Sequence, residues 1–207
     1  MPTFYHAPHS RSTAILTLVH ELGDPADLDI VRVGIRRGDG SGAPDPRNPH
    51  PEGKVPFIAD GDDMIRERAA IIAWLTERYP SDLAPLAGQT GRGPFLSWLA
   101  WYAGVMEPVA ILDYFGIEND GLKETFRDLP TAIRQVEAAL KDRSYLLGDS
   151  YTAADLLIAG AFAFFRQMIP GTGPIEAWVG RCQDRDSVRR AAAEDAEWME
   201  RMSSPAA

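Results

Sequence analysis

The sequence is poor in cysteine, because its 207 residues include only one, Cys182. A single cysteine excludes a disulfide within the chain and is typical of a protein from a reducing compartment. The chain also lacks an excess of positive charge: 21 Lys and Arg residues stand against 30 Asp and Glu residues, for a net charge of −9. Acidic residues outnumber basic ones on both sides of Pro80. This balance argues against a nucleic acid or an anionic membrane as partner.

Long apolar runs are absent as well. His6, His9 and Arg11 interrupt the N-terminal stretch, so no apolar core of a signal segment is expected there. The longest apolar run, Leu156 to Phe165, is shorter than the roughly 20 residues that span a bilayer as a helix. We therefore predict a cytoplasmic protein without a membrane-spanning segment.

What the sequence does contain is the composition of a globular protein, with 45% hydrophobic and 25% charged residues. Up to Pro80 the periodicity predicts strands and helices in the order βαβ–ββα. A helix between the first two strands implies a parallel pair with a right-handed crossover. We predict a small α/β domain over residues 1–80, with a surface loop at 36–51 that has little helix. The expected strands are 3–7, 31–35, 57–60 and 64–65, and the expected helices are 15–22 and 71–79.

The second half of the chain has a different pattern. Residues 81–93 are rich in Pro and Gly and predict a linker, whereas the apolar period of residues 94–207 is helical throughout. The run 156–165 is apolar on nearly all sides, as expected for a helix in the centre of a bundle. Thr152 and Asp155 have the spacing of a capping box at its start, and losing such a cap costs on the order of 1 kcal/mol. An ordinary helix start explains these two residues equally well.

Two short segments carry the strongest functional signal. His50–Ile58 places Pro56 at the mouth of a buried strand, and Glu67–Ile71 puts an acid and a base at the start of a helix. The backbone at Val55 offers an open edge, and a helix N-terminus attracts anions. A ligand suited to both features is a short, zwitterionic peptide.

Five segments, in the right order along nearly the whole chain, resemble motifs of the glutathione transferases. Each motif is weak alone, and the five in register are specific. They are the first strand-to-helix turn Tyr5–Ser12, the end of the first helix Glu21–Gly23, the proline loop His50–Pro56, the acidic helix start Glu67–Ile71 and the capping box Thr152–Asp155.

The resemblance implies a thioredoxin-like N-terminal domain, a helical-bundle C-terminal domain and a homodimer. It also implies glutathione as cosubstrate, with no metal. The backbone of Val55 would pair with the cysteinyl backbone of glutathione, beside a cis bond to Pro56. Glu67 would receive the γ-glutamyl ammonium, and Lys54 and Arg68 would meet carboxylates. The alternative for each of the three charged residues is a solvated surface charge.

The chemistry implied by the family needs a thiolate, yet a free thiol with a pKa near ~8.5 is mostly protonated at neutral pH. Ser10 aligns with the catalytic serine or cysteine of the family, and its hydroxyl would donate a hydrogen bond to the sulfur. The alternative for Ser10 is an N-cap or turn serine, a role for which Ser12 competes. Tyr5 is a rival donor, with a buried strand aromatic as its own alternative. Because position 10 is not cysteine, thiol–disulfide exchange is not expected as the main activity.

Two features depart from the family pattern. Arg68 stands where serine commonly follows the acidic residue, and it would either strengthen an anion contact or block the pocket. The loop 36–47 lacks a clear second helix, which leaves the contact with the glycyl end of glutathione the least defined. The electrophile pocket is assigned to a helical stripe that core packing or a dimer interface explains as well, namely Trp98, Trp101, Tyr102 and Met106.

The sequence therefore predicts a glutathione transferase that joins the thiolate to small hydrophobic electrophiles in detoxification, with reduction of organic hydroperoxides as a further activity. A glutathione-dependent isomerase or dehalogenase on the same scaffold is an alternative. A non-catalytic protein-interaction module is another, which Arg68 favours. No metal site is predicted, because matching Cys or carboxylate spacing is lacking around His6, His9, His20 and His50.

Overall fold

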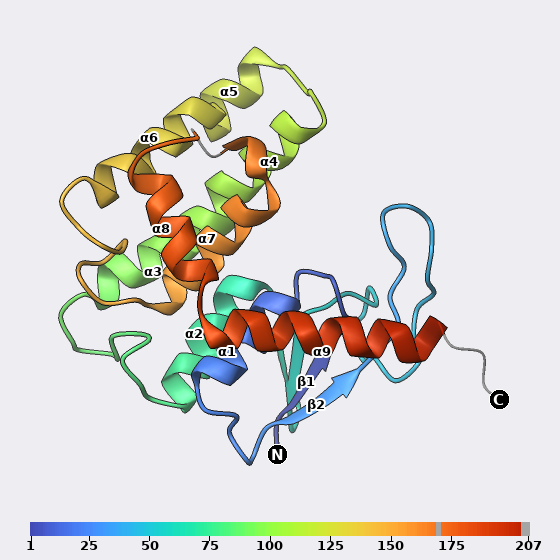
Figure 1. The fold of residues 1–207 in the computed structure, drawn as a ribbon. Coiled ribbons are helices and arrows are strands. Elements are labelled where there is room, and N and C mark those ends of the chain that lie inside the picture. Colours follow the sequence, from blue (N-terminus) through green and yellow to red (C-terminus); the bar gives the residue numbers. More distant parts are fainter. Residues whose placement is uncertain (169–170, 204–207) are drawn as a thin grey trace. The chain divides into compact units, whose positions relative to one another are not determined.

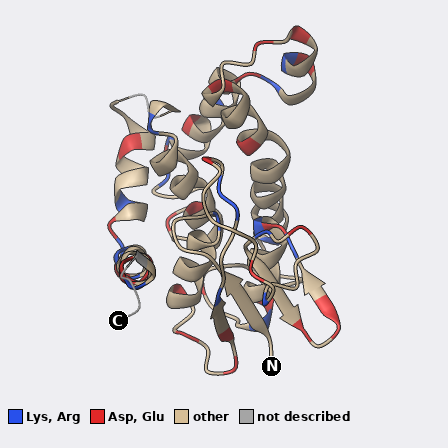
Figure 2. Ribbon diagram, turned by 90° about the vertical axis from the view of Figure 1, so that its right-hand side faces the viewer, with Lys and Arg blue, Asp and Glu red and all other residues tan. Residues whose placement is uncertain are grey.

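A computed structural model describes residues 1–168 and 171–203. The chain forms two compact units (Figure 1). Met1–Tyr79 and the C-terminal segment from Asp186 make the first unit, and Pro80–Arg185 make the second. The N-terminal segment of the first unit ends at Tyr79, and the α/β domain was expected over residues 1–80. Acidic and basic residues occur on both units, as the red and blue segments of Figure 2 show.

The first unit contains the predicted βαβ–ββα order. Its sheet has the strand order β2-β1-β3-β4, with β1 and β2 parallel and the other two pairings antiparallel. Residues 33–56 contain neither helix nor strand, which confirms the predicted loop at 36–51. The strand expected at 31–35 lies earlier, at Asp29–Arg32, so residues 33–35 belong to the loop. The elements are β1 (Thr3–His6), α1 (Thr13–Glu21), β2 (Asp29–Arg32), β3 (Phe57–Asp60), β4 (Asp63–Ile65) and α2 (Arg68–Arg78).

Strand register brings three chain segments to one edge of this sheet. Tyr5 lies opposite Phe57, and Ile58 lies opposite Ile65. Because both pairings are antiparallel, the carboxyl ends of β1 and β4 meet the amino end of β3 at this edge. The segments found there are the first turn (residues 7–12), the Val55–Pro56 peptide bond and the start of α2 at Glu67.

The last helix, α9 (Asp186–Ser203), packs against α1 within the first unit (Figure 1). The sequence assigns this segment to the helical domain, whereas its contacts in the structure lie within the first unit. An apolar period shows that one face of a helix is buried but not against which partner. Ala191 of α9 is fully buried, Arg32 of β2 donates to Glu194 at 2.9 Å, and Ser187 donates to Glu21. The first unit is therefore assembled from segments at both ends of the sequence.

The second unit is helical throughout its regular elements. Helix α7 lies at its core, since nine of its twelve residues are buried, as its all-round apolar pattern predicts. The predicted capping box at Thr152 and Asp155 is present. The elements are α3 (Arg92–Trp101), the π-helical η1 (Tyr102–Met106), α4 (Glu107–Tyr114), α5 (Asp120–Phe126), α6 (Leu129–Leu140), α7 (Ala153–Phe164), the short η2 (Arg166–Met168) and α8 (Pro174–Gln183).

The continuous stretch α3–η1–α4, Arg92–Tyr114, is by length and composition able to cross a membrane. Uninterrupted apolar runs in the sequence do not reveal it, because charged residues interrupt this stretch. Core helices of globular proteins have the same length and apolarity. Part of the stretch is buried, as expected for a core helix: the side chains are those of Phe95, Leu99, Tyr102, Met106, Val109 and Ala110.

Candidate functional site

The first turn places the hydroxyl of Ser10 just before the N-terminus of α1. Ser10 Oγ donates to the carbonyl of Ala7 at 2.7 Å and lies 2.7 Å from Ser12 Oγ. It also accepts a hydrogen bond from the backbone N–H of Ser12 at 3.1 Å. Ser12 occupies the N-cap position of α1 but makes no side-chain cap bond there. The two serines therefore form one hydroxyl pair, of which Ser10 is the partly exposed member.

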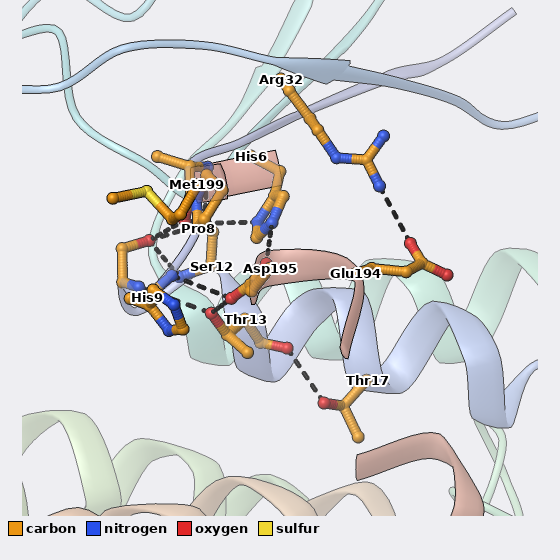
Figure 3. Close-up of polar contacts among 12 residues, drawn as sticks. His6, Pro8, His9, Ser12, Thr13, Thr17, Arg32, Glu194, Asp195 and Met199 are labelled. Carbon is orange, nitrogen blue, oxygen red and sulfur yellow. Dashed lines mark hydrogen bonds and ion pairs between the residues drawn. The ribbon is translucent and has the colours of Figure 1, made fainter. Parts of the chain in front are cut away.

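Beneath this pair lies a buried polar network that joins β1, α1 and α9 (Figure 3). His6 Nδ1 is 2.8 Å from Ser12 Oγ, and His6 Nε2 is 2.8 Å from Asp195 Oδ1. The other carboxylate oxygen, Oδ2, accepts from the backbone N–H of His9 at 2.8 Å and from Thr13 Oγ1 at 2.6 Å. His6, Ser12 and Asp195 are all 0% exposed. A carboxylate without solvent is thus surrounded by donors.

The pKa of Asp195 reflects two opposing effects. Burial raises the pKa of this carboxyl, while the bonds from His6, Thr13 and the His9 amide lower it. The net result is a pKa below the ordinary value, so Asp195 is an anion at neutral pH. The network holds that charge at the start of α1, where Thr13, the first residue of the helix, donates to it.

The proline loop presents a backbone edge beside the first turn. The Val55–Pro56 bond is cis, and Pro56 is buried while Val55 is half-buried. The buried Asn48 donates through Nδ2 to the carbonyl of Lys54 at 3.0 Å, which fixes the backbone that leads into this bond. The Lys54 side chain is exposed.

The start of α2 has a strained backbone at Glu67. This residue has φ 66° and ψ 129°, a combination that costs a non-glycine residue about 1–3 kcal/mol. Its carbonyl accepts the N–H of Ile71 at 2.9 Å, and its side chain is exposed. Arg68 follows as the first residue of α2, half-buried, in a first turn with no acidic residue. Arg68 and the helix N-terminus favour an anionic group of a ligand, while the carboxylate of Glu67 at the N-cap position suits a cationic one.

Tyr5, the rival donor, lies within β1. Its ring is 5.8 Å from the Phe57 ring at an interplanar angle of 45°, so part of it packs on the sheet. Like Ser10, it is half-buried.

The four residues assigned to the electrophile pocket lie on α3 and η1. Trp98 and Trp101 are half-buried and meet edge to face, with ring centroids 5.1 Å apart. Tyr102 and Met106 are almost wholly buried, at 2% and 1% exposure, as a core role requires. The stripe therefore divides into two core residues and a partly exposed tryptophan pair.

Sequence reasoning missed Asp195 and the role of His6, which it considered only as a metal ligand. A signal was present, because Asp195 falls on the same helical face as Ala191, four residues earlier, and an acid on a buried face needs a partner. Arg37 was missed too: it donates to the carbonyls of Pro8 at 2.9 Å and His9 at 3.3 Å, tying the long loop to the first turn.

Metal ligation finds no support in residues 1–168 and 171–203, where no group of three or more His, Cys, Asp or Glu side chains could hold an ion. Cys182 is buried in α8, and burial raises the pKa of its thiol far above the ordinary value. It takes no part in the cluster at the sheet edge.

Comparison with known proteins agrees with this architecture. The model of the glutathione S-transferase C-terminal domain matches residues 100–190. Glutathione S-transferase F10 of Arabidopsis thaliana is 30% identical over 159 residues, covering 71% of this chain and 72% of the relative. A glutathione S-transferase structure from Actinobacillus pleuropneumoniae has a TM-score of 0.76 at 22% identity, covering 95% of this chain and 93% of that one. A sphingomonad glutathione S-transferase complexed with glutathione has a TM-score of 0.72 at 22% identity, covering 94% and 98%.

The structural likenesses establish a thioredoxin-like unit combined with a helical one, as expected from the sequence. The chain belongs to the glutathione S-transferase family, a family of transferase enzymes.

Proposed function

We propose that this protein joins the thiolate of glutathione to small hydrophobic electrophiles, with Ser10 as the residue that stabilises the sulfur anion. The observation that carries the proposal is the position of the Ser10 hydroxyl. It lies on the turn that opens α1, at the sheet edge where strand register also gathers the cis Val55–Pro56 bond and the strained Glu67.

In this proposal the tripeptide lies along that edge. The backbone of Val55 pairs with the cysteinyl backbone, and the carboxylate of Glu67 receives the γ-glutamyl ammonium. Arg68 and Lys54 meet the carboxylates of glutathione, which a protein with a net charge of −9 would otherwise repel at long range. The strain at Glu67 supports this assignment, because such backbone outliers cluster where ligands are held.

The energy needed for a thiolate is within reach of a neutral hydroxyl. Lowering a thiol pKa by about two units takes roughly 2.7 kcal/mol of differential stabilisation. A hydroxyl bond to a charged atom contributes about 1.5–3 kcal/mol. The N-terminus of α1 adds ~0.3–1 kcal/mol. These contributions suffice without a charged group in contact with the sulfur.

For the electrophile we propose contact with the half-buried pair Trp98 and Trp101, backed by the buried Tyr102 and Met106. We further propose a cytoplasmic homodimer with a role in detoxification and a secondary activity on organic hydroperoxides. The single buried cysteine and the acidic composition support a reducing, aqueous compartment.

The test replaces Ser10 by Ala and follows the thiolate absorbance of bound glutathione against pH. We expect the apparent thiol pKa to return toward ~8.5 and turnover on a model aryl halide to fall about 10²-fold, while glutathione affinity changes little. Tyr5→Phe is the matched control, since it also removes one hydroxyl. If Y5F gives the loss and S10A does not, Tyr5 is the donor.

The same assays separate the alternative functions. Glutathione binding without turnover on any model electrophile would indicate a protein-interaction module. Halide release from a dihaloalkane as the dominant activity would indicate a dehalogenase, and conversion of a model substrate without consumption of glutathione would indicate an isomerase.

A further inference from the structure

The buried network below Ser10 has a direction, which follows from counting donors and acceptors. Asp195 is a carboxylate with donors on both oxygens, so His6 presents Nε2–H to it. In the neutral imidazole the other nitrogen, Nδ1, is then an unprotonated acceptor. That acceptor faces Ser12 Oγ at 2.8 Å. With the ring in this form, the Ser12 hydroxyl donates to His6 Nδ1 at 2.8 Å rather than to its other acceptor, the Ala7 carbonyl at 3.1 Å.

The direction continues outward to Ser10. Ser12 Oγ already accepts from the backbone N–H of Ala7 at 3.0 Å, and it lies 2.7 Å from Ser10 Oγ. Since the Ser12 proton is engaged with His6, Ser10 is the donor in the contact between the two hydroxyls when its proton turns toward Ser12 from the Ala7 carbonyl, its other acceptor at 2.7 Å. An unbroken series of short contacts thus leads from the partly exposed Ser10 through Ser12 to the buried His6 Nδ1.

We propose that His6 accepts the proton of the glutathione thiol through Ser10 and Ser12, with Asp195 holding the ring and stabilising the imidazolium. This inference rests on the proposed function, because it takes Ser10 as the neighbour of the sulfur. His6, Ser12 and Asp195 do not touch the tripeptide, so they are positioning residues for the Ser10 hydroxyl.

The step conserves every atom and charge. The S–H bond breaks as its proton passes to Ser10 Oγ, the Ser10 proton passes to Ser12 Oγ, and the Ser12 proton passes to His6 Nδ1. The products are a thiolate and an imidazolium, and no group is oxidised or reduced. Afterwards every bond points the other way: Nδ1–H donates to Ser12, Ser12 donates to Ser10, and Ser10 donates to the sulfur. Once the sulfur has become a thioether, the proton returns by the same route to water or to the leaving group.

The groups around the His6 ring support Asp195 as the residue that stabilises the imidazolium. Among the described residues, Asp195 is the one charged group hydrogen-bonded to the His6 ring, and the Phe4 ring packs 5.7 Å away. Several other charged or titratable groups of the packed elements have partners of their own. Arg32 of β2 pairs with Glu194 of α9, and His20 of α1 pairs with Asp24 and Glu194. Arg37 of the loop donates to the carbonyls of Pro8 and His9. The backbone N–H of His9 donates to Asp195.

A purely structural role for the network makes a different prediction about protons. If the network only holds α9 against the turn, the thiol proton passes to the buffer, and one proton is released for each thiolate formed. A relay retains that proton on His6, so fewer protons are released than thiolates formed. The count is measurable by calorimetric titration with glutathione in two buffers of different ionisation enthalpy, alongside the thiolate absorbance.

The decisive variant is Asp195→Asn. Its amide oxygen can still accept from the His9 N–H and Thr13, while its NH₂ group faces His6 Nε2 and turns that nitrogen into an acceptor. Nδ1 then carries the proton, so the network keeps its hydrogen bonds and loses its proton acceptor. Ser12→Ala removes the link by a separate route. Glu194→Gln is the matched control, since it changes the neighbouring residue of α9 and leaves the network intact.

We expect the wild type and E194Q to form thiolate at neutral pH with clearly less than one proton released per thiolate. D195N and S12A should bind glutathione with the midpoint of the thiolate titration moved to higher pH. Each pH unit of that displacement leaves about tenfold less thiolate at neutral pH, and one proton should be released for each thiolate still formed. Circular dichroism identifies any variant that fails to fold, in which case the other variant decides.

The two proposals fail in distinguishable ways. One proton released per thiolate in the wild type, or a D195N protein with unchanged thiolate titration and proton count, overturns the relay and leaves Ser10 as donor. An S10A protein with an unchanged titration overturns the proposed role of Ser10 itself, and the relay with it.

Discussion

Single residues of this protein show how strongly their surroundings set their reactivity. Cys182 carries the only thiol of the chain and is 1% exposed. Burial raises the pKa of this thiol, and the charge of Asp155 raises it further. Only the thiolate reacts with electrophilic reagents, so position decides that this sulfur is inert.

We therefore predict that Cys182 in the native protein reacts with an aromatic disulfide reagent on the order of a hundredfold more slowly than in the chain unfolded by guanidinium. The measurement is the rate of thiol release at pH 8, with the unfolded chain as control. Rapid labelling of the native protein would contradict the assigned burial.

Glu67 allows stability and binding to be separated at one residue. Replacing it by Gly relieves the positive φ, which favours the folded state, but removes the carboxylate proposed for the γ-glutamyl ammonium. In urea denaturation we expect the free energy of unfolding of E67G to equal that of the wild type or to exceed it by up to about 1 kcal/mol. We expect E67G to bind glutathione at least tenfold more weakly.

Glu67→Gln is the control for that experiment, because it keeps the strain and removes only the charge. A drop in stability for E67G with unchanged affinity for glutathione would remove Glu67 from the site.

Among the secondary-structure elements, α7 depends on its capping carboxylate. Asp155 is fully buried and accepts from the backbone N–H groups of Thr152 and Leu146 and from Trp178 Nε1, each at 2.9 Å. Burial raises the pKa of Asp155, and these bonds oppose the rise. The carboxylate thus joins the start of α7 to α8 and to the preceding loop.

Asp155→Ala should lower the free energy of unfolding by about 3 kcal/mol or more, because it leaves several buried donors without acceptors. Asp128→Ala is the matched control: Asp128 caps α6 by accepting from Thr131 N–H at 2.9 Å, but in an exposed position. Its loss should cost about 1 kcal/mol. Equal losses in urea denaturation would show that the buried network adds nothing to an ordinary cap.

The same comparison shows which elements a sequence can reveal. The capping box at Thr152 and the hairpin of β3 and β4 were predictable, because the residues that make them are close along the chain. The docking of α9 was not, since the apolar face around Ala191 would suit any partner. The π-helical turn η1 also escaped prediction, as Tyr102–Met106 continue the ordinary helical period of α3.

At the scale of the whole molecule, the fold could be predicted because five short motifs occur in the sequence in the order and at the spacing that the fold requires. The candidate site could be predicted only in part. Ser10, Val55 and Glu67 belong to local motifs, whereas the partner of His6 lies 189 positions away. Nothing in a single sequence states that two such distant residues meet in a folded unit.

The stability of the first unit should depend on pH because of the buried contact between His6 and Asp195. The pKa of Asp195 is lower in the folded protein than its ordinary value of 3.8, so the folded state binds the proton more weakly than the unfolded state. The stabilisation is fully present above about pH 4 and is lost as the pH falls through the folded pKa.

We predict that the wild type loses more of its free energy of unfolding between pH 6 and pH 3 than Asp195→Asn does, by up to about 1 kcal/mol. Chemical denaturation at each pH measures this, and the difference between the two proteins removes the contribution of other acids. Parallel curves for the two proteins would show that Asp195 has no depressed pKa.

The return of α9 to the first unit has a consequence for how the polypeptide is made. A ribosome produces His6, Ser12 and Thr13 long before it produces Asp195, so the growing chain carries an imidazole, a threonine hydroxyl and a backbone amide that still await their anion. The sheet unit cannot complete its interior until translation has reached Asp195, 189 positions after His6. The surroundings of Ser10 are therefore completed only after α9 has been synthesised.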